Sequence, residues 1–309
     1  MRRLLIIGCG DVLRRALPRL TSRWRVYALV RKHDPALAAL GVTQLLGNLD
    51  QADTLHRLRG VAQAVIHSAP PPDQGDTDPR TRRLIAALSG TSYSPPGKAL
   101  QARRSVLQRL VYISTTGVYG DCAGAQIDET QTLAPLSARA RRRVDAERQL
   151  RDFGKRGNCR VSILRAPGIY AADRLPLERL RKGLPLLTAE DDVFTNHIHA
   201  EDLGEACIAA LDRGGANRVY NVCDNSDIRM GDWYDKLADA FALPHAPRLA
   251  RKEAEKVLPP MQISFMRESR RIGNARIKRE LNLRLRYPTI GSGIVAAQKQ
   301  LKGMTHALG

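Results

Sequence analysis

Short apolar runs alternate with amphipathic stretches through the first half of the chain, a pattern typical of a parallel sheet covered on both faces by helices. The apolar runs are too short for helices and predict buried strands at residues 3–7, 25–30, 42–46, 63–67, 110–114 and 160–164. The stretches between them predict helices at residues 11–22, 34–40, 51–58, 78–89, 98–108 and 137–153. Crossovers of this kind are right-handed, and they place ligands at the carboxyl ends of the strands.

The alternation of apolar runs and amphipathic stretches ends after Arg165. The stretch "APGIYAADRLPLERLRKGLP" is rich in Pro and Gly, whereas "IHAEDLGEACIAALDR" predicts a capped helix and "RVYNVCD" a further strand. We therefore predict an α/β fold, a Rossmann-type doubly wound parallel sheet with a smaller C-terminal α/β substrate lobe. The expected NAD(P)-binding domain is residues 1–165 plus about 201–224, and the expected substrate-binding lobe is residues 166–200 and 225–309.

The composition fits a globular protein, because 43% of its 309 residues are hydrophobic. The longest apolar runs, such as residues 4–7, are far too short to cross a bilayer, so we expect no association with a membrane. The five cysteines are scattered and form no CxxC pair, which argues against a disulfide framework and a zinc site. We expect a cytoplasmic protein.

The net charge of +19 permits binding to nucleic acid, to anionic surfaces or to phosphorylated ligands. The arginines are spread along the chain, however, and aromatic residues make up only 5% of it. A surface that stacks the bases of single-stranded nucleic acid needs interleaved aromatic residues. We therefore favour general basicity over nucleic-acid binding, which stays open as an alternative function on the same fold.

A possible dinucleotide site follows the first predicted strand, where "LLIIGCGDVL" places three candidate cofactor-binding residues, Gly8, Gly10 and Asp11, and a helix begins near Asp11. Gly8 permits a tight turn, and Gly10 lets the backbone approach a pyrophosphate at the helix N-terminus. The third position of the pattern, where a small residue lets helix and strand pack closely, is Leu13, which predicts a displaced helix or a shifted phosphate site. A GxG pair alone is a weak signal, and a plain strand-to-helix turn is the alternative, but its place at the first strand strengthens it.

The end of the second predicted strand distinguishes the two nicotinamide cofactors. An acidic residue there binds the ribose 2′-hydroxyl of NAD, whereas arginine accommodates the 2′-phosphate of NADP. The sequence has Arg31 and Lys32 first and Asp34 later, which favours NADP over NAD. The alternative is that Arg31 and Lys32 are solvated loop charges.

Several segments together resemble the extended short-chain dehydrogenases/reductases, the NAD-dependent epimerase/dehydratase group. In order they are "LLGNLDQADTL", "VIHSAPP", "YISTTGVYGD", "DETQTLAP", "LRAPGIY", "NHIHAEDLGEA" and "VYNVCD". The resemblance spans roughly residues 3–245. It implies a Rossmann domain that holds a nicotinamide cofactor, a lobe that closes over a substrate that is often a nucleotide sugar, and a homodimer through helices 98–108 and 137–153.

The resemblance also implies site residues. Those that would contact the cofactor are Gly8, Gly10 and Arg31 at the phosphates, Asn48 and Leu49 by the adenine, and Ser68, Ala69 and Pro70 near the nicotinamide-side ribose. Thr115 falls where the family has its catalytic serine or threonine, and a hydroxyl there can donate to a substrate oxygen as charge develops on it. Thr116 beside it is a candidate for substrate binding. The alternative for Thr115 is a strand-end threonine that binds backbone.

The family's acid/base pair, Tyr-x-x-x-Lys, maps onto "PLSARARRRVDAE" at residues 135–147. With Pro135 and Glu147 on the pattern's proline and glutamate, Arg139 takes the tyrosine position and Arg143 the lysine position. Arginine stays protonated in proteins, so neither residue can exchange a proton with substrate. Two guanidiniums on one helix face can bind a carboxylate or phosphate, and a solvated face is the alternative.

If the chain is an enzyme, its proton donor comes from elsewhere. The candidates are Tyr119, Tyr170 and His197, with His199 as a possible substrate ligand. His197 and His199 alternate along a predicted strand, so at most one faces the cleft, and no third ligand at a telling spacing suggests a metal. We favour an atypical NADP-dependent oxidoreductase or epimerase-like enzyme acting on an anionic small molecule. A non-catalytic NADP-binding sensor or scaffold is the second hypothesis.

Overall fold

The computed structural model describes residues 1–89, 107–157 and 159–306. Its centre is a seven-stranded sheet in the order β12-β7-β5-β4-β1-β2-β3, and every neighbouring pair is parallel. The strands are β1 (Arg3–Ile7), β2 (Arg25–Val30), β3 (Thr43–Leu46), β4 (Ala64–His67), β5 (Arg109–Thr115), β7 (Arg160–Ala166) and β12 (Arg218–Asn221). The predicted fold class, a Rossmann-type doubly wound sheet, is confirmed.

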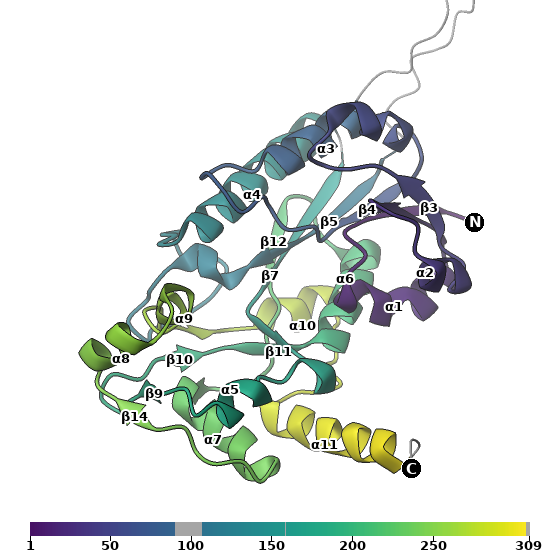
Figure 1. Cartoon of the computed structure of the whole chain (residues 1–309). Coiled ribbons are helices and arrows are strands. Elements are labelled where there is room, and N and C mark those ends of the chain that lie inside the picture. The colour runs from purple at the N-terminus through teal and green to yellow at the C-terminus, as the bar shows by residue number, and fades with distance from the viewer. Residues whose placement is uncertain (90–106, 158, 307–309) are drawn as a thin grey trace, which may run out of the picture.

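Helices cover both faces of this sheet (Figure 1). Because side chains alternate along a strand, Leu4 and Ile6 of β1 pack in one core cluster and Leu5 and Ile7 in another. The first cluster is shared with α1 (Asp11–Thr21), α6 (Ala200–Arg213) and α10 (Ala275–Leu281), and the second with α3 (Pro79–Ser89) and α4 (Ala138–Gly157). All these positions on β1 are fully buried, which explains the unbroken apolar run in its sequence.

The predicted elements of the first half agree closely with the observed ones. Each of the six predicted strands is present with ends within two residues of the prediction. The helix predicted at residues 34–40 is the short α2 (Pro35–Ala39), whereas the one predicted at 51–58 is a 3₁₀ helix, Ala52–Leu58. Most of the helix predicted at 98–108 lies outside the described residues.

A smaller lobe lies below the sheet in Figure 1 and has its own apolar core around Trp233 and Leu237. Its helices are α5 (Leu177–Arg181), α7 (Met230–Ala240), α8 (Arg251–Val257), α9 (Pro260–Phe265) and α11 (Ile290–His306). Its strands are β8 (Gly168–Tyr170), β9 (Leu186–Leu187), β10 (Phe194–Thr195), β11 (His197–His199), β13 (Ile228–Arg229), β14 (Arg248–Leu249) and β15 (Arg271–Ile272). In the described part of the chain, no helix is both long and apolar enough to cross a membrane.

Residues 268–272 of the lobe are joined by backbone hydrogen bonds to the loop that follows β5. The carbonyl oxygen of Ser269 accepts from the amides of Cys122 (3.1 Å) and Gly124 (2.9 Å). Next to it, β15 pairs in parallel with β6 (Gln126–Ile127). These contacts fix the lobe against the carboxyl edge of the central sheet.

Candidate functional site

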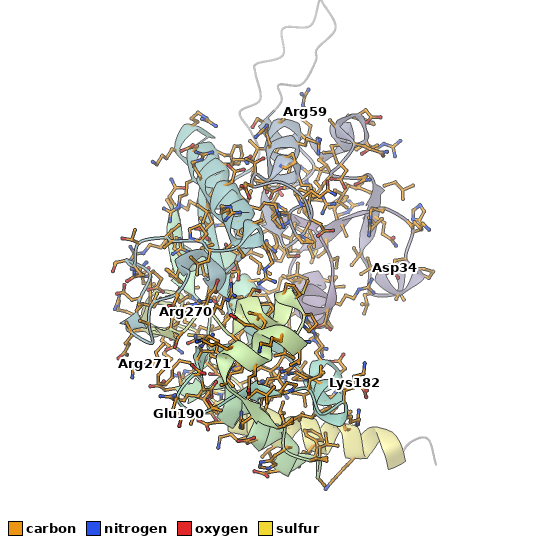
Figure 2. The ribbon with its side chains drawn as sticks, turned by 60° about the vertical axis from the view of Figure 1, so that its left-hand side comes forward. Asp34, Arg59, Lys182, Glu190, Arg270 and Arg271 are labelled. Carbon is orange, nitrogen blue, oxygen red and sulfur yellow. The ribbon has the colours of Figure 1, made fainter. Side chains whose placement is uncertain are left out.

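A cavity of about 1530 Å³ lies where the carboxyl ends of the sheet strands meet the small lobe. This is the edge at which open parallel α/β sheets bind their ligands. Figure 2 labels one residue from each wall, Asp34 after β2 and Arg270 from the lobe. The predicted site residues that line the cavity are Gly8, Gly10, Asp11, Arg31, Lys32, Ser68, Ala69, Pro70, Thr115, Thr116, Arg139, Arg143 and His197. The predicted residues outside its lining are Asn48, Leu49, Tyr119, Tyr170 and His199.

The turn after β1 has the backbone that a bound diphosphate requires. Gly8 has a φ of +87°, and a Cβ there would lie 2.5 Å from the amide nitrogen of Ala69. A Cβ on Gly10 would meet no atom within 4 Å, so the backbone at Gly10 is open to an approaching ligand. α1 begins directly afterwards at Asp11, whose carboxylate accepts from Arg15 (3.0 Å). The turn and the helix N-terminus therefore fit a dinucleotide.

Leu13, at the third position of the glycine pattern, is buried in the core cluster between α1 and the sheet. Close packing of α1 is instead found against α6. A Cβ on Gly204 of α6 would lie 3.2 Å from the Cβ of Ala16 and 3.3 Å from the carbonyl oxygen of Val12. A small residue thus lets α6, rather than a strand, approach α1.

Three basic residues, Arg14, Arg31 and Lys32, line the cavity beside the end of β2. Arg14 is ion-paired with Asp34, and its Nε donates to the carbonyl oxygen of Cys9 at 3.3 Å. The Arg14 guanidinium lowers the pKa of Asp34 below its ordinary value. Asp34 also accepts from the amide of Ala36 as the N-cap of α2, so its carboxylate is already bonded within the protein.

The predicted adenine contacts, Asn48 and Leu49, are not brought to the cavity. Both precede the 3₁₀ helix, and the amide of Asn48 donates to Thr54 Oγ1 at 2.9 Å. The Leu49 side chain is buried in the core cluster that also contains Leu55. Ser68, Ala69 and Pro70 after β4 do line the cavity, and the Ser68 hydroxyl is bonded to the carbonyl oxygen of Gly8.

Thr115 is half-buried at the carboxyl end of β5 and lines the cavity. Its Oγ1 accepts from the amide of Gly117 at 3.2 Å, which leaves the hydroxyl proton free to donate. Thr116 also lines the cavity but is buried. Tyr119, by contrast, is fully buried outside the lining, where its hydroxyl donates to Asn221 Oδ1 at 2.6 Å.

The two arginines at the tyrosine and lysine positions have different environments. Arg143 Nη1 donates to the Tyr112 hydroxyl and to the carbonyl oxygen of Ile113, both at 2.9 Å, so its side chain is held against β5. The guanidinium of Arg139 lies 4.5 Å from the centroid of the Phe265 ring on α9. Arg139 is exposed, and partial desolvation lowers its pKa. Both residues face the cavity from α4.

Glu147, four residues beyond Arg143, has both oxygens bonded to buried Arg165 of β7, at 2.7 and 3.1 Å. It also accepts from the Ser114 hydroxyl at 2.7 Å. These bonds fix α4 against β5 and β7, and hence fix the positions of Arg139 and Arg143.

The two histidines of β11 have different environments. His197 lines the cavity and is buried, and its Nδ1 has no hydrogen-bond partner in the described chain. Burial lowers the pKa of His197 to about 3, so the imidazole is neutral. His199 lies outside the lining as the N-cap of α6, where Nδ1 accepts from the amide of Glu201 at 3.3 Å. Buried Tyr170 packs edge-on against both rings.

The small lobe supplies further cavity residues that the sequence did not predict, because their place in the cavity depends on tertiary packing. The polar and aromatic ones are Arg174, Arg179, Phe194, Thr195, Asn196, Trp233, Tyr234, Gln262, Phe265, Glu268 and Arg270. Arg270 Nη1 donates to the carbonyl oxygen of Gly120 (2.7 Å) and to Glu268 (2.8 Å). Among the described residues, no group of three or more His, Cys, Asp or Glu side chains could hold a metal ion.

The glycine turn, the parallel sheet and the cavity at its carboxyl edge define a dinucleotide-binding α/β protein of the Rossmann type. The sequence matches the NAD-dependent epimerase/dehydratase family over residues 10–223, more than half of the chain. The chain therefore belongs to this family, whose members bind a nicotinamide cofactor.

Curated relatives are distant. The chain is 26% identical to the GDP-6-deoxy-D-mannose reductase of Pseudomonas aeruginosa in an alignment of 202 residues that covers 55% of this chain and 66% of that protein. It is 24% identical to the dTDP-D-glucose 4,6-dehydratase of Mus musculus in an alignment of 132 residues that covers 40% of this chain and 37% of that protein. The matches therefore span less than two thirds of either relative.

Solved structures match the whole fold. A conserved protein of unknown function from Silicibacter pomeroyi is 31% identical, with a TM-score of 0.79 over 97% of this chain and 99% of that one. The UDP-glucose 4-epimerase of Thermotoga maritima is 13% identical, with a TM-score of 0.76 over 98% and 99% of the two chains. At that identity the second match shows the fold alone.

Proposed function

We propose that this protein is an NADP-dependent oxidoreductase that acts on a small anionic molecule resembling a nucleotide sugar. The observation that carries the proposal is one continuous cavity, which runs from the Gly8–Gly10 turn past Thr115 to the arginines of α4 and the small lobe. When bound, the cofactor accepts or supplies a hydride. The expected division into residues 1–165 plus about 201–224, and 166–200 plus 225–309, stays part of this proposal, and it is supported by lining residues that come from both parts.

The preference for NADP is supported by the charge at the end of β2. Arg14, Arg31 and Lys32 all line the cavity there, and the nearby carboxylate of Asp34 is bonded to Arg14. Guanidiniums bind phosphate bidentately, and a hydrogen bond to a charged group contributes about 1.5–3 kcal/mol. NAD, which lacks the 2′-phosphate, gains nothing from these residues.

Calorimetric titration with NADPH and NADH tests the cofactor proposal. Arg31→Ala is expected to weaken NADPH binding about tenfold or more and to leave NADH binding unchanged. Arg25→Ala is the matched control, because Arg25 is exposed at the opposite end of the same strand. Tighter binding of NADH than of NADPH by the unaltered protein would contradict the proposal.

An anionic substrate is supported by the charges in the rest of the cavity. Arg139, Arg143, Arg179 and Arg270 line its substrate half, and the only carboxylate among the described lining residues there is Glu268. Thr115 and neutral His197 can each donate one hydrogen bond to a substrate oxygen. The names of the relatives, a GDP-sugar reductase and a dTDP-sugar dehydratase, favour a nucleotide sugar.

The acid/base set is proposed to be non-standard. None of the eight tyrosines in the sequence is followed by a lysine four residues later. The positions that would hold this pair by the spacing from Pro135 to Glu147 are Arg139 and Arg143, which have no lone pair to accept a proton. Tyr119 and Tyr170, both buried outside the cavity lining, do not supply an accessible phenol.

The same arginines favour a second candidate, a non-catalytic NADP-binding sensor or scaffold. The two functions differ in hydride consumption, which absorbance at 340 nm follows with UDP-glucose, dTDP-glucose and GDP-6-deoxy-D-mannose as probes. Tight NADPH binding with no redox change for any probe would favour the sensor. Arg139→Tyr with Arg143→Lys is the second test, because activity gained by that variant would show that only the catalytic pair is missing.

We keep the cytoplasm as the proposed location, because all five cysteines are free thiols, as is usual in reducing compartments. A homodimer through residues 98–108 and α4 stays a prediction. A basic nucleic-acid-binding function is disfavoured by the ion pairing of many arginines, such as those of Arg80 with Asp50 and Arg218 with Glu280.

A further inference from the structure

Glu268 is a carboxylate held at a fixed place in the substrate half of the cavity. The residue after it, Ser269, is bonded on both sides of its backbone to the loop that follows Tyr119. Its amide donates to Asp121 Oδ1 at 2.7 Å, and its carbonyl oxygen accepts from the amides of Cys122 and Gly124. The position of Glu268 is therefore set by the same loop that continues from Thr115.

The two oxygens of the Glu268 carboxylate differ. Oε2 accepts from Arg270 Nη1 at 2.8 Å, and the same nitrogen donates to the carbonyl oxygen of Gly120 at 2.7 Å. Oε1 has no hydrogen-bond partner in the described chain, although only 12% of the side chain is exposed. One oxygen thus orients the group, and the other is available to a ligand in the cavity that Glu268 lines.

Glu268 is also close to the helix position that carries the tyrosine in the family pattern. Arg139 at that position lies over the Phe265 ring, three residues before Glu268. Desolvation lowers the pKa of Arg139, and the negative charge of Glu268 opposes this effect, so the two groups are in electrostatic range. A proton acceptor from the small lobe therefore lies beside the arginine that cannot accept one.

We propose that Glu268 is the acid/base residue of this protein and replaces the missing phenol from the opposite wall of the cavity. In the oxidative direction a bound cofactor would accept the hydride as the substrate C–H bond breaks, and Glu268 Oε1 would accept the substrate O–H proton as the C–O bond becomes a carbonyl. In the reverse direction the protonated carboxyl returns that proton to the oxygen. The proposal rests on the oxidoreductase function above.

Three other groups that line the cavity are less suited to this step. Asp11 and Asp34 lie at the dinucleotide end and are bonded to arginines. His197 has a pKa lowered to about 3 by burial, so it would release an accepted proton at once and serves better as a hydrogen-bond donor. The titratable groups that face Glu268 are Arg270, Arg139 and Cys122.

Glu268→Gln tests the proposal, because its amide oxygen still accepts from Arg270 while the proton-accepting ability is lost. With the three nucleotide sugars above as probes and NADP⁺ as cofactor, kcat is expected to fall about 10²- to 10⁴-fold. Added formate should restore part of the activity of Glu268→Ala. Calorimetric NADPH binding should stay within about twofold of the unaltered protein.

Glu255→Gln is the matched control, since Glu255 is also paired with an arginine of the small lobe, Arg267 at 2.7 Å, but does not line the cavity. It should keep full activity. Turnover by Glu268→Gln close to that of the unaltered protein, or a change in KM alone, overturns the assignment and leaves the oxidoreductase function standing. NADPH binding without turnover of any probe by the unaltered protein overturns both.

Discussion

Replacing Glu147 with leucine is expected to destabilise the protein severely, because it leaves a buried guanidinium unpaired. Glu147 and Arg165 are 2% and 3% exposed, and they are joined by two hydrogen bonds, with a third from Ser114. Removing one partner of a buried ion pair costs about 3–5 kcal/mol. Since the free energy of unfolding of a domain is about 5–15 kcal/mol, this is a large share of the total.

Urea unfolding followed by circular dichroism measures the effect. Because the cost arises from the unpaired charge, the double variant Glu147→Leu with Arg165→Met should recover most of the lost stability. Glu280→Leu is the control, since its pair with Arg218 is partly exposed and worth about 1 kcal/mol or less. A loss below about 1 kcal/mol for Glu147→Leu, or a double variant no more stable than the single one, would refute the reasoning.

Three further outcomes are expected. Gly8→Ala should lower the free energy of unfolding by about 1–3 kcal/mol and abolish NADPH binding in calorimetry. The reason is that the φ of Gly8 is +87° and the new Cβ would lie 2.5 Å from the amide nitrogen of Ala69. Unchanged NADPH binding would contradict this prediction. Leu13→Ala should lose about 2–5 kcal/mol in urea unfolding, since a fully packed core side chain is removed, and a loss under 1 kcal/mol would show that the site collapses. Burial raises the pKa of Asp224 to about 6, so the folded protein keeps a proton that the unfolded chain releases above about pH 4. The contribution of Asp224 to the free energy of unfolding therefore falls as the pH rises from about 4 to 6. Urea unfolding measured across this pH range should show the fall in the unaltered protein and not in Asp224→Asn.

The central sheet could be predicted from the sequence because its strands are buried on both faces. Runs such as residues 4–7 and 110–113 are apolar without interruption, and each leads to residues that must lie at one edge of a parallel sheet. That is why Gly8, Arg31 and Thr115, far apart along the chain, could be placed near one another before the structure was known. All three line the cavity.

The contribution of the small lobe could not be predicted in this way. Glu268 and Arg270 belong to no segment with a periodic pattern of apolar residues. Their position depends on the pairing of β15 with β6, and this pairing joins residues that are more than 140 positions apart in the chain. The prediction of Tyr119 and Tyr170 as candidate proton donors met the opposite difficulty. Both residues lie in recognisable segments, but their side chains are buried in the interior. The motif predicted where these residues lie along the backbone, but it did not predict which way their side chains point.

The backbone bonds between residues 268–272 and the loop after β5 have a consequence for ligand entry. They tie both walls of the cavity together on one side, so a rigid-body rotation of the lobe would have to break them. Little chain entropy is then lost on association, and free and bound forms should differ mainly in side-chain rotamers. Which ligand the protein binds would accordingly depend on the shape and charge of a preformed cavity.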